Sequence, residues 1–410
     1  MPAHQFPRSP VPTPSPVSTP VERPFPRAAL GVLALLGFTL ISTETMPAGV
    51  LHQIASGMGT SEGVVGQFVS AYALGTVLLT VPAIALTRSW PRKRLLITGI
   101  LAFLLANTVT ALSGGVTLSL VSRFVAGGCS GTLWGMLAGY ALRIAPPAAA
   151  GRALSLISVG APVGIAFGTP LGTWLGTTFG WRWSFAGLSV LAVVVLVLVV
   201  ALVPAADGQS ATSHRPASQV VRIPAVALTL VVIVLWMLGN TTTYTYIAPF
   251  LRAGGSTVPL EGLLLVFGLA SIVGIALTAS LIDRAPRALV LGCAGAFALS
   301  GVVLVLFPHS PVVVHVAVAV WGVAFGGASP QLQRPLAAAG GEDADVANSF
   351  LPVAFNVAIF AAGVLGALVL ASGGGRLLPL AMTAGGGAAF AVLVLGLRTV
   401  YPQHAPARTP

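Results

Sequence analysis

Long apolar segments alternate with short polar ones along nearly the whole of this 410-residue chain. A helical segment of about 20 apolar residues, rising 1.5 Å per residue, spans the ~30 Å hydrocarbon core of a bilayer. Such segments must be helical, because lipid offers no partner for unpaired backbone groups. The sequence therefore predicts an all-α membrane protein with twelve transmembrane helices, at residues 28–51, 63–87, 95–113, 116–142, 152–177, 182–203, 224–250, 260–282, 287–307, 311–333, 346–371 and 377–398.

The longest polar interruption, residues 204–222, divides the predicted spans into six and six. Two equal sets of spans are typical of transporters built from two halves. The first tail is rich in Pro, Ser and Thr and too poor in apolar residues to pack, so we expect it to be disordered. The predicted divisions are a cytoplasmic tail at 1–27, a six-helix bundle at 28–203, a cytoplasmic linker at 204–223, a second six-helix bundle at 224–400 and a cytoplasmic tail at 401–410.

Charged residues make up 7% of the chain, against about 25% in soluble domains, which again indicates a membrane protein. The net charge of +11 does not indicate nucleic-acid binding, because the basic residues lie in short loops between spans. Most of the 20 Lys and Arg residues fall on the side of the N-terminus, with Arg182, Arg252 and Arg376 on the opposite side. This asymmetry predicts a multi-pass protein of the plasma or inner membrane with both termini in the cytoplasm.

Sequence signals for an enzyme, a cofactor or a metal site are absent. The single lysine, Lys93, does not lie in a phosphate-binding G-x-x-x-x-G-K-[ST] loop, so the chain is not expected to hydrolyse ATP. No Cys/His cluster has the spacing of a metal site. Any transport is therefore expected to draw its energy from a gradient or a partner.

Glu44 lies inside the first predicted span, where a carboxylate costs several kcal/mol unless it is protonated, paired or facing water. Arg123 lies inside the fourth span, and counting residues from the outer surface places both at about the same depth. We expect an ion pair that forms and breaks as Glu44 exchanges a proton. The alternatives are a static pair, or a neutral Glu44 bonded to neighbouring groups.

Further polar and aromatic side chains within the spans are candidates for a substrate cavity. Residues of these types also bond to their own helix or anchor it at the interface, so each has a purely structural alternative. The candidates are Gln67, Tyr72, Asn107, Trp134, Asn240, Tyr244 and Asn356.

Glycines recur every fourth residue along the fifth span, at Gly164, Gly168 and Gly172, with Pro170 between them. Small residues let helices approach closely and prolines let them bend, so this span is a candidate for a mobile interface between the halves. Ordinary small-residue packing is the alternative. In the loops after the second and eighth spans, Arg92, Asp283 and Arg284 are candidates for conformational latches, and topology signals are the alternative.

Four stretches resemble the major facilitator superfamily, and within it the twelve-helix drug/proton antiporters similar to bacterial arabinose-efflux and chloramphenicol-resistance exporters. These are Thr43–Gly49 followed by Gly66–Gln67 and Ala71–Gly75, then Arg123–Gly127, Gly164–Gly172 and Gly180–Phe185. The resemblance implies a role in proton transfer for Arg123 and an exporter signature in the fifth span. The usual Asp-Arg after the second helix is Arg88-Ser89 here, whereas Asp283-Arg284 keeps the pair in the second half.

Together these features predict a monomeric, proton-coupled antiporter that exports small uncharged or amphipathic molecules, such as drugs or antibiotics, by alternating access. Its expected partners are the substrate, protons and the lipid bilayer, with no cofactor. An efflux transporter for sugars or nucleosides is one alternative, and a non-transporting receptor or scaffold on the same fold is another.

Overall fold

A computed structural model describes residues 25–87, 90–146, 149–205, 217–341 and 344–400. The predicted tails lie almost wholly outside these ranges, as does most of the predicted linker. The described residues form helices and no strand. The helices are α1 (Arg27–Gly49), α2 (Leu51–Met58), α3 (Glu62–Leu86), α4 (Arg92–Leu112), α5 (Val116–Ile144), α6 (Ala150–Ser158), α7 (Gly160–Val163), a π-helical turn (Gly164–Gly168), α8 (Thr169–Phe179), α9 (Trp181–Leu202), α10 (Ala217–Val220), α11 (Pro224–Thr245), α12 (Ile247–Ala253), α13 (Leu260–Leu281), α14 (Pro286–Leu306), α15 (Pro311–Gly326), α16 (Ala328–Gly340), α17 (Ala344–Ala371), a 3₁₀ turn (Gly375–Leu377) and α18 (Leu380–Val400).

Twelve helical stretches of the described chain are long and apolar enough to cross a membrane, as predicted. They run Arg27–Gly49, Glu62–Ile84, Arg92–Leu112, Val116–Ile144, Gly151–Phe179, Trp181–Leu202, Pro224–Thr245, Leu260–Leu281, Pro286–Leu306, Pro311–Gly340, Ala347–Ala371 and Gly375–Gly396. Large apolar side chains such as Leu105, Val190 and Leu395 are exposed on these helices, as expected of surfaces that face lipid.

Three spans differ in detail from the prediction. The seventh helix ends at Thr245, and the predicted residues up to 250 belong to the short helix α12. The tenth span is divided at Gly327 into α15 and α16. The fifth span contains the π-helical turn Gly164–Gly168, a local widening of the helix of a kind frequent at functional sites.

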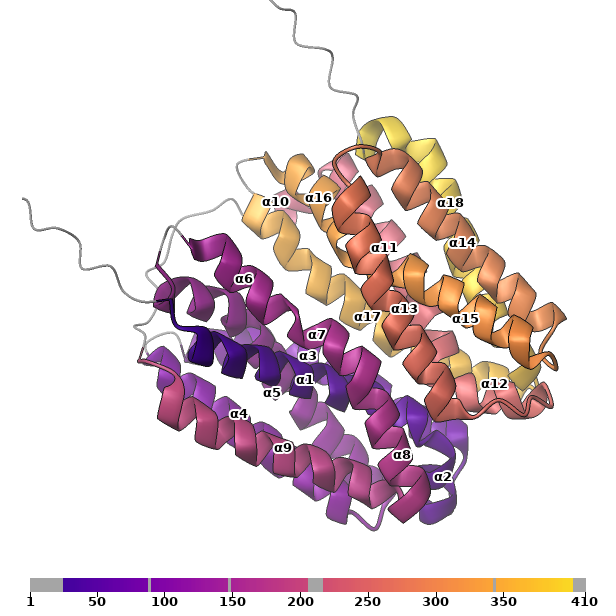
Figure 1. The fold of residues 1–410 in the computed structure, drawn as a ribbon, viewed down its shortest axis with the longest axis horizontal. Coiled ribbons are helices and arrows are strands. Elements are labelled where there is room, and N and C mark those ends of the chain that lie inside the picture. The colour runs from indigo at the N-terminus through magenta and orange to yellow at the C-terminus, as the bar shows by residue number, and fades with distance from the viewer. Residues whose placement is uncertain (1–24, 88–89, 147–148, 206–216, 342–343, 401–410) are drawn as a thin grey trace, which may run out of the picture.

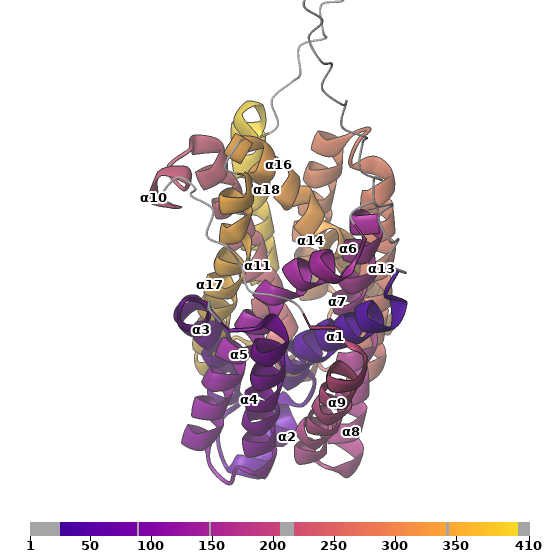
Figure 2. The same ribbon diagram turned by 90° about the vertical axis from the view of Figure 1, so that its left-hand side faces the viewer.

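The helices form two bundles, α1–α9 and α11–α18, which lie side by side in Figure 1 and overlap in the turned view of Figure 2. Helices α2, α8 and α12 lie together at one end of the molecule, which is called the α2–α12 end (Figure 1). Helices α6, α10 and α16 lie toward the other end, which is called the α6–α16 end. The predicted architecture of two six-helix bundles is confirmed.

Glycines bring two helices of each bundle into backbone contact. A Cβ on Gly127 of α5 would lie 1.8 Å from the carbonyl oxygen of Tyr72 in α3. In the second bundle, a Cβ on Gly326 of α15 would lie 2.0 Å from the carbonyl oxygen of Ser271 in α13. Both distances are far below any van der Waals contact, so only glycine allows these helix pairs to pack as they do. The two contacts occupy equivalent places in the two halves.

Candidate functional site

The site is centred on Arg123, whose side chain is fully buried within the first bundle. Its Nη2 donates a hydrogen bond of 2.9 Å to the backbone carbonyl of Thr43 in α1. Its guanidinium lies 4.5 Å from the ring centroid of Tyr72 and 5.8 Å from that of Phe185. The Nε and Nη1 atoms are buried without a hydrogen-bond partner. The Arg123 guanidinium is therefore held by one backbone carbonyl and two aromatic rings, and its Nε and Nη1 groups remain available to donate further hydrogen bonds.

Glu44 follows Thr43 in α1, so the predicted proximity of the acid and the base is observed. The side chains of Glu44 and Thr45 are half-buried, whereas those of Thr43 before them and Met46 after them are buried. Arg123 is the charged group that acts electrostatically on Glu44. The expected ion pair is not formed in this conformation, however, and within the described chain the Glu44 carboxyl has no hydrogen bond. Arg123 is bonded to the backbone next to Glu44 instead.

Polar groups continue from Glu44 toward the second bundle. The hydroxyls of Thr45 in α1 and Thr169 in α8 share a hydrogen bond of 2.6 Å. The hydroxyl of Tyr244 in α11 is buried and lies close to the Thr169 hydroxyl. Tyr244 therefore brings a polar group of the second bundle close to the acid-bearing helix of the first.

An aromatic cluster surrounds Tyr244 on the second bundle. The Tyr244 ring lies 5.2 Å from that of Phe267, which in turn lies 4.8 Å from that of Trp321. The Trp321 Nε1 donates a hydrogen bond of 2.8 Å to Oδ1 of Asn240. This bond orients the indole of Trp321 and the amide of Asn240. The amide oxygen of Asn240 is used by this bond, and its NH₂ group is available to another acceptor.

The remaining cavity candidates lie in different surroundings. Gln67 donates a hydrogen bond of 3.0 Å to the carbonyl of Gly363 and so joins α3 to α17 of the other bundle. Trp134 packs close to Gly37 of α1. Asn356 donates to the carbonyl of Pro352 on its own helix, and its Oδ1 has no partner. Asn107 is fully buried and donates to the carbonyl of Phe103 on its own helix, whereas its Oδ1 has no partner, so a place on the cavity remains a prediction.

The glycines of the fifth span pack against α1 of the same bundle. Cβ atoms on Gly164 and Gly168 would lie 2.1 Å from Ile41 and 1.9 Å from Ser42, and one on Gly172 would lie 2.7 Å from the Met46 sulfur. The expectation that this glycine face meets the other half was therefore wrong. The contact between the halves is made elsewhere on the span, where a Cβ on Gly268 of α13 would lie 2.2 Å from Cα of Ala166.

Pro170 occupies the first turn of α8 and has no backbone N–H to donate back to the helical turn before it. Its position just after the π-helical turn marks the boundary between two differently wound parts of one span. The fifth span is thus built from short segments, and α8 carries Thr169 of the site.

Of the loop candidates, Asp283 makes a contact within its own half. It lies just after the end of α13 and accepts a hydrogen bond of 2.8 Å from Nη1 of Arg334 in α16, in an exposed ion pair. The Arg92 side chain is buried and its Nε has no partner, whereas Arg284 is exposed. A latch between the two halves at these residues is not seen in this conformation, and a latch in another conformation remains a prediction.

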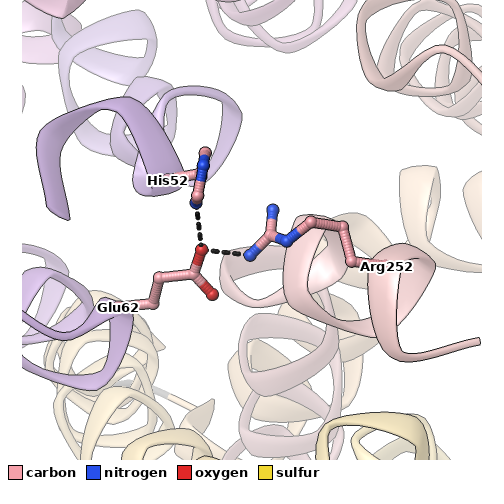
Figure 3. Close-up of polar contacts among 3 residues, drawn as sticks. All are labelled: His52, Glu62 and Arg252. Carbon is pink, nitrogen blue, oxygen red and sulfur yellow. Dashed lines mark hydrogen bonds and ion pairs between the residues drawn. The ribbon is translucent and has the colours of Figure 1, made fainter. Parts of the chain in front are cut away.

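A contact that the sequence did not suggest joins the bundles at the α2–α12 end. Glu62 at the start of α3 forms an ion pair with Arg252 of α12, and its Oε1 also lies 2.9 Å from Nδ1 of His52 in α2 (Figure 3). Gln67 and Ser70 on the same helix bond to the carbonyls of Gly363 and Phe360 in α17. All three contacts lie in the first third of α3. The bundles are therefore held together at this end.

Glu62 and Arg252 are far apart in sequence, and each lies at the outer end of its span, where charges are ordinary. The available signal was that Glu62 is an acid on the side where the sequence places few basic residues, of which Arg252 is one.

Comparisons with known proteins agree with this architecture. Residues 33–339 match the family profile of the Major Facilitator Superfamily. The chain is 30% identical over 377 residues to a chloramphenicol efflux pump of Mycobacterium tuberculosis strain ATCC 25618 / H37Rv, covering 87% of this chain and 90% of that protein. A chloramphenicol efflux pump of strain CDC 1551 / Oshkosh is also 30% identical, over 372 residues.

A solved structure of similar fold is that of a bacterial homologue of the human lysosomal transporter Spinster, in an inward-facing and unoccupied conformation. The TM-score is 0.64 at 14% identity, covering 92% of this chain and 96% of that one, which is evidence for the fold alone. The family profile and the two efflux pumps show the protein family as well as the fold. The chain belongs to the major facilitator superfamily.

Proposed function

We propose that this transporter is a proton-coupled exporter of small uncharged or amphipathic molecules, and that drugs or antibiotics are its substrates. The observation that carries the proposal is the half-buried Glu44 carboxyl, without a hydrogen bond in the described chain, beside the fully buried Arg123. An acid at this depth is costly to keep charged, so it exchanges protons as its surroundings change. The efflux activity named for the two 30% identical relatives supports the direction of transport.

The coupling rests on the unused donors of Arg123. With Glu44 ionised, the Nε and Nη1 groups of Arg123 have an anion to attract, and the pair favours one arrangement of α1 and α5. Protonation of Glu44 removes that attraction and leaves Arg123 bonded to the Thr43 carbonyl, as in this structure. A ligand shifts a conformational equilibrium only by its difference in affinity for the two states, and this exchange of partners supplies such a difference for the proton.

The aromatic cluster supports an uncharged substrate. Tyr244, Phe267 and Trp321 offer apolar ring surface, and Asn240 and Tyr244 add polar groups near the acid-bearing helix. In the described part of the spans, Glu44 and Arg123 are the charged residues at this depth and act on each other, so little charge is left to recognise an ionic solute. Gln67 and Trp134 complete the proposed lining, together with Tyr72 and Asn356.

We further propose that the chain works as a monomer in the plasma or inner membrane with both termini in the cytoplasm. On this orientation the α2–α12 end faces outward, and the contacts of Glu62, Gln67 and Ser70 close the transporter on the outside. The structure then corresponds to a conformation that receives substrate from the cytoplasmic side, as an exporter requires.

The proposal is tested with the purified full-length protein in liposomes. A pH gradient is imposed across the membrane, and the movement of a panel of uncharged antibiotics, sugars and nucleosides is followed with and without a protonophore. Gradient-driven movement of an antibiotic that the protonophore abolishes is the expected result. Movement of sugars or nucleosides alone would favour an efflux transporter for those compounds. Binding without movement of any compound would contradict a transport function.

Weakening the outer contact should shift the transporter toward its outward-open state. We expect Glu62→Gln to raise the outward-open population by roughly two- to fivefold, because an exposed ion pair contributes only about 0.2–1 kcal/mol. Spin labels at the exposed residues Ser56 and Thr257 would report the separation of the outer ends by pulsed electron spin resonance. His52→Ala is the matched control, since it keeps the pair between Glu62 and Arg252. An unchanged distance distribution in Glu62→Gln would show that the pair does not contribute to closure.

A further inference from the structure

A shallow, open basic hollow lies at the α6–α16 end of the first bundle, between the start of α1 and the start of α6. Its volume is about 910 Å³. Arg27 and Arg152 lie on its wall with the ring of Phe25, and Gly31, Leu156 and Val159 make its apolar part. Gly31 of the hollow lies 13 residues before Glu44 on α1, roughly 20 Å away along the helix, and the hollow shares no lining residue with the proposed transport site.

The two arginines of the hollow have no anionic partner. Within the described chain, neither the Arg27 nor the Arg152 side chain makes a hydrogen bond or an ion pair, and no acidic residue lines the hollow. The guanidinium of Arg152 lies 5.3 Å from the centroid of the Phe25 ring, which orients it along the wall. Two like charges in one concave site raise the local potential and attract an anion.

The position of the hollow fits a ligand at the membrane surface. Arg27 is the first residue of α1, and Arg152 lies at the beginning of the fifth span. Leu156 and Val159 lie one and two helical turns further along that span, roughly 6–10 Å deeper into the bilayer at 1.5 Å per residue. The charged part of the hollow therefore lies at headgroup level, and its apolar part lies at the level of the upper acyl chains.

We propose that this hollow binds the headgroup of an anionic phospholipid, with the phosphate between Arg27 and Arg152 and the first acyl methylenes along Leu156 and Val159. Guanidinium groups recognise phosphate through paired N–H donors, and basic pockets between helices on one face of a membrane bind anionic headgroups. The apolar wall favours a lipid over free phosphate, because free phosphate has nothing to bury there. This lipid site does not depend on the proposed drug export.

Titration of the full-length protein in detergent, followed by native mass spectrometry, tests the site with phosphatidylglycerol and phosphatidylcholine as probes. We expect one tightly held phosphatidylglycerol, and affinity reduced roughly thirtyfold in the double variant Arg27→Gln with Arg152→Gln. Arg94→Gln with Arg222→Gln is the matched control, because it removes two exposed arginines from the same face of the membrane outside the hollow. The control should bind phosphatidylglycerol as the wild type does.

Three results would overturn the proposal. They are equal phosphatidylglycerol affinity in the wild type and the hollow variant, equal affinity of the wild type for the two lipids, and an equal loss in both double variants. Displacement of the lipid by millimolar inorganic phosphate would assign the site to free phosphate instead. Arg27→Lys with Arg152→Lys keeps both charges and should retain most of the affinity. If the Gln variant does not fold, the comparison of the two lipids on the wild type still decides.

Discussion

Glu44→Gln is expected to abolish export driven by a pH gradient while leaving exchange of substrate across the membrane in place. Glutamine keeps the size and hydrogen-bonding capacity of a protonated carboxyl but cannot release a proton. Arg123 would then remain bonded to the Thr43 carbonyl at every pH. Coupling free energies of 1–3 kcal/mol correspond to 5–150-fold, so gradient-driven accumulation should fall by roughly a hundredfold. The measurement is uptake into liposomes with an imposed gradient, beside counterflow without one.

Glu62→Gln is the matched control for this prediction, because it removes the other acid of the first bundle's described helices, at the α2–α12 end. It should retain proton-driven export, changed by no more than the roughly two- to fivefold shift expected from the outer contact. Counterflow by the wild type should change with pH, and counterflow by Glu44→Gln should not. Full gradient-driven accumulation by Glu44→Gln would contradict the coupling role. Loss of both counterflow and accumulation would place Glu44 in substrate binding instead.

The spans were predictable because bilayer thickness imposes a length on each apolar segment, and the sequence displays that length directly. The proximity of Glu44 and Arg123 followed from the same arithmetic, since residue counting gives depth in a membrane. The hydrogen bond of Arg123 to the Thr43 carbonyl was not predictable, because a backbone acceptor leaves no trace in the sequence. The absence of an ion pair between Glu44 and Arg123 was not predictable either. Equal depth places the two residues at the same level, but the rotation of each helix about its axis decides which atoms come into contact.

Lateral neighbours were the least predictable feature. The spacing of Gly164, Gly168 and Gly172 identifies a face that approaches another helix, and the structure shows that helix to be α1. Nothing in the spacing distinguishes α1 from a helix of the other bundle. The same limit hid the ion pair of Glu62 with Arg252, whose residues come together only through the packing of the two halves. Asn107 was polar within a span, yet its own helix satisfies its amide donor.

Gly127→Ala is expected to be among the most destabilising single substitutions in the first bundle. The added Cβ would lie 1.8 Å from the Tyr72 carbonyl oxygen, and backbone atoms cannot rotate away as a side chain can. Helices α3 and α5 would have to separate, which also breaks the hydrogen bond of 2.9 Å from Thr76 to the Gly127 carbonyl. Overpacking usually costs about 1–3 kcal/mol, and this backbone contact should cost about 3 kcal/mol or more. Thermal denaturation followed by size-exclusion chromatography measures the effect.

Gly139→Ala is the matched control on the same helix, since a Cβ there meets nothing within 4 Å. It should be neutral or slightly stabilising, because alanine favours a helix over glycine by about 1 kcal/mol. Gly326→Ala makes the equivalent change in the second bundle, where the Cβ would lie 2.0 Å from the Ser271 carbonyl oxygen, and it should destabilise to a similar extent. Equal stability of Gly127→Ala and Gly139→Ala would contradict the close packing.

In Gly127→Ala, separation of α3 from α5 also moves Tyr72 away from the Arg123 guanidinium. Protein that survives the substitution should therefore show weaker proton coupling, which Gly326→Ala should spare.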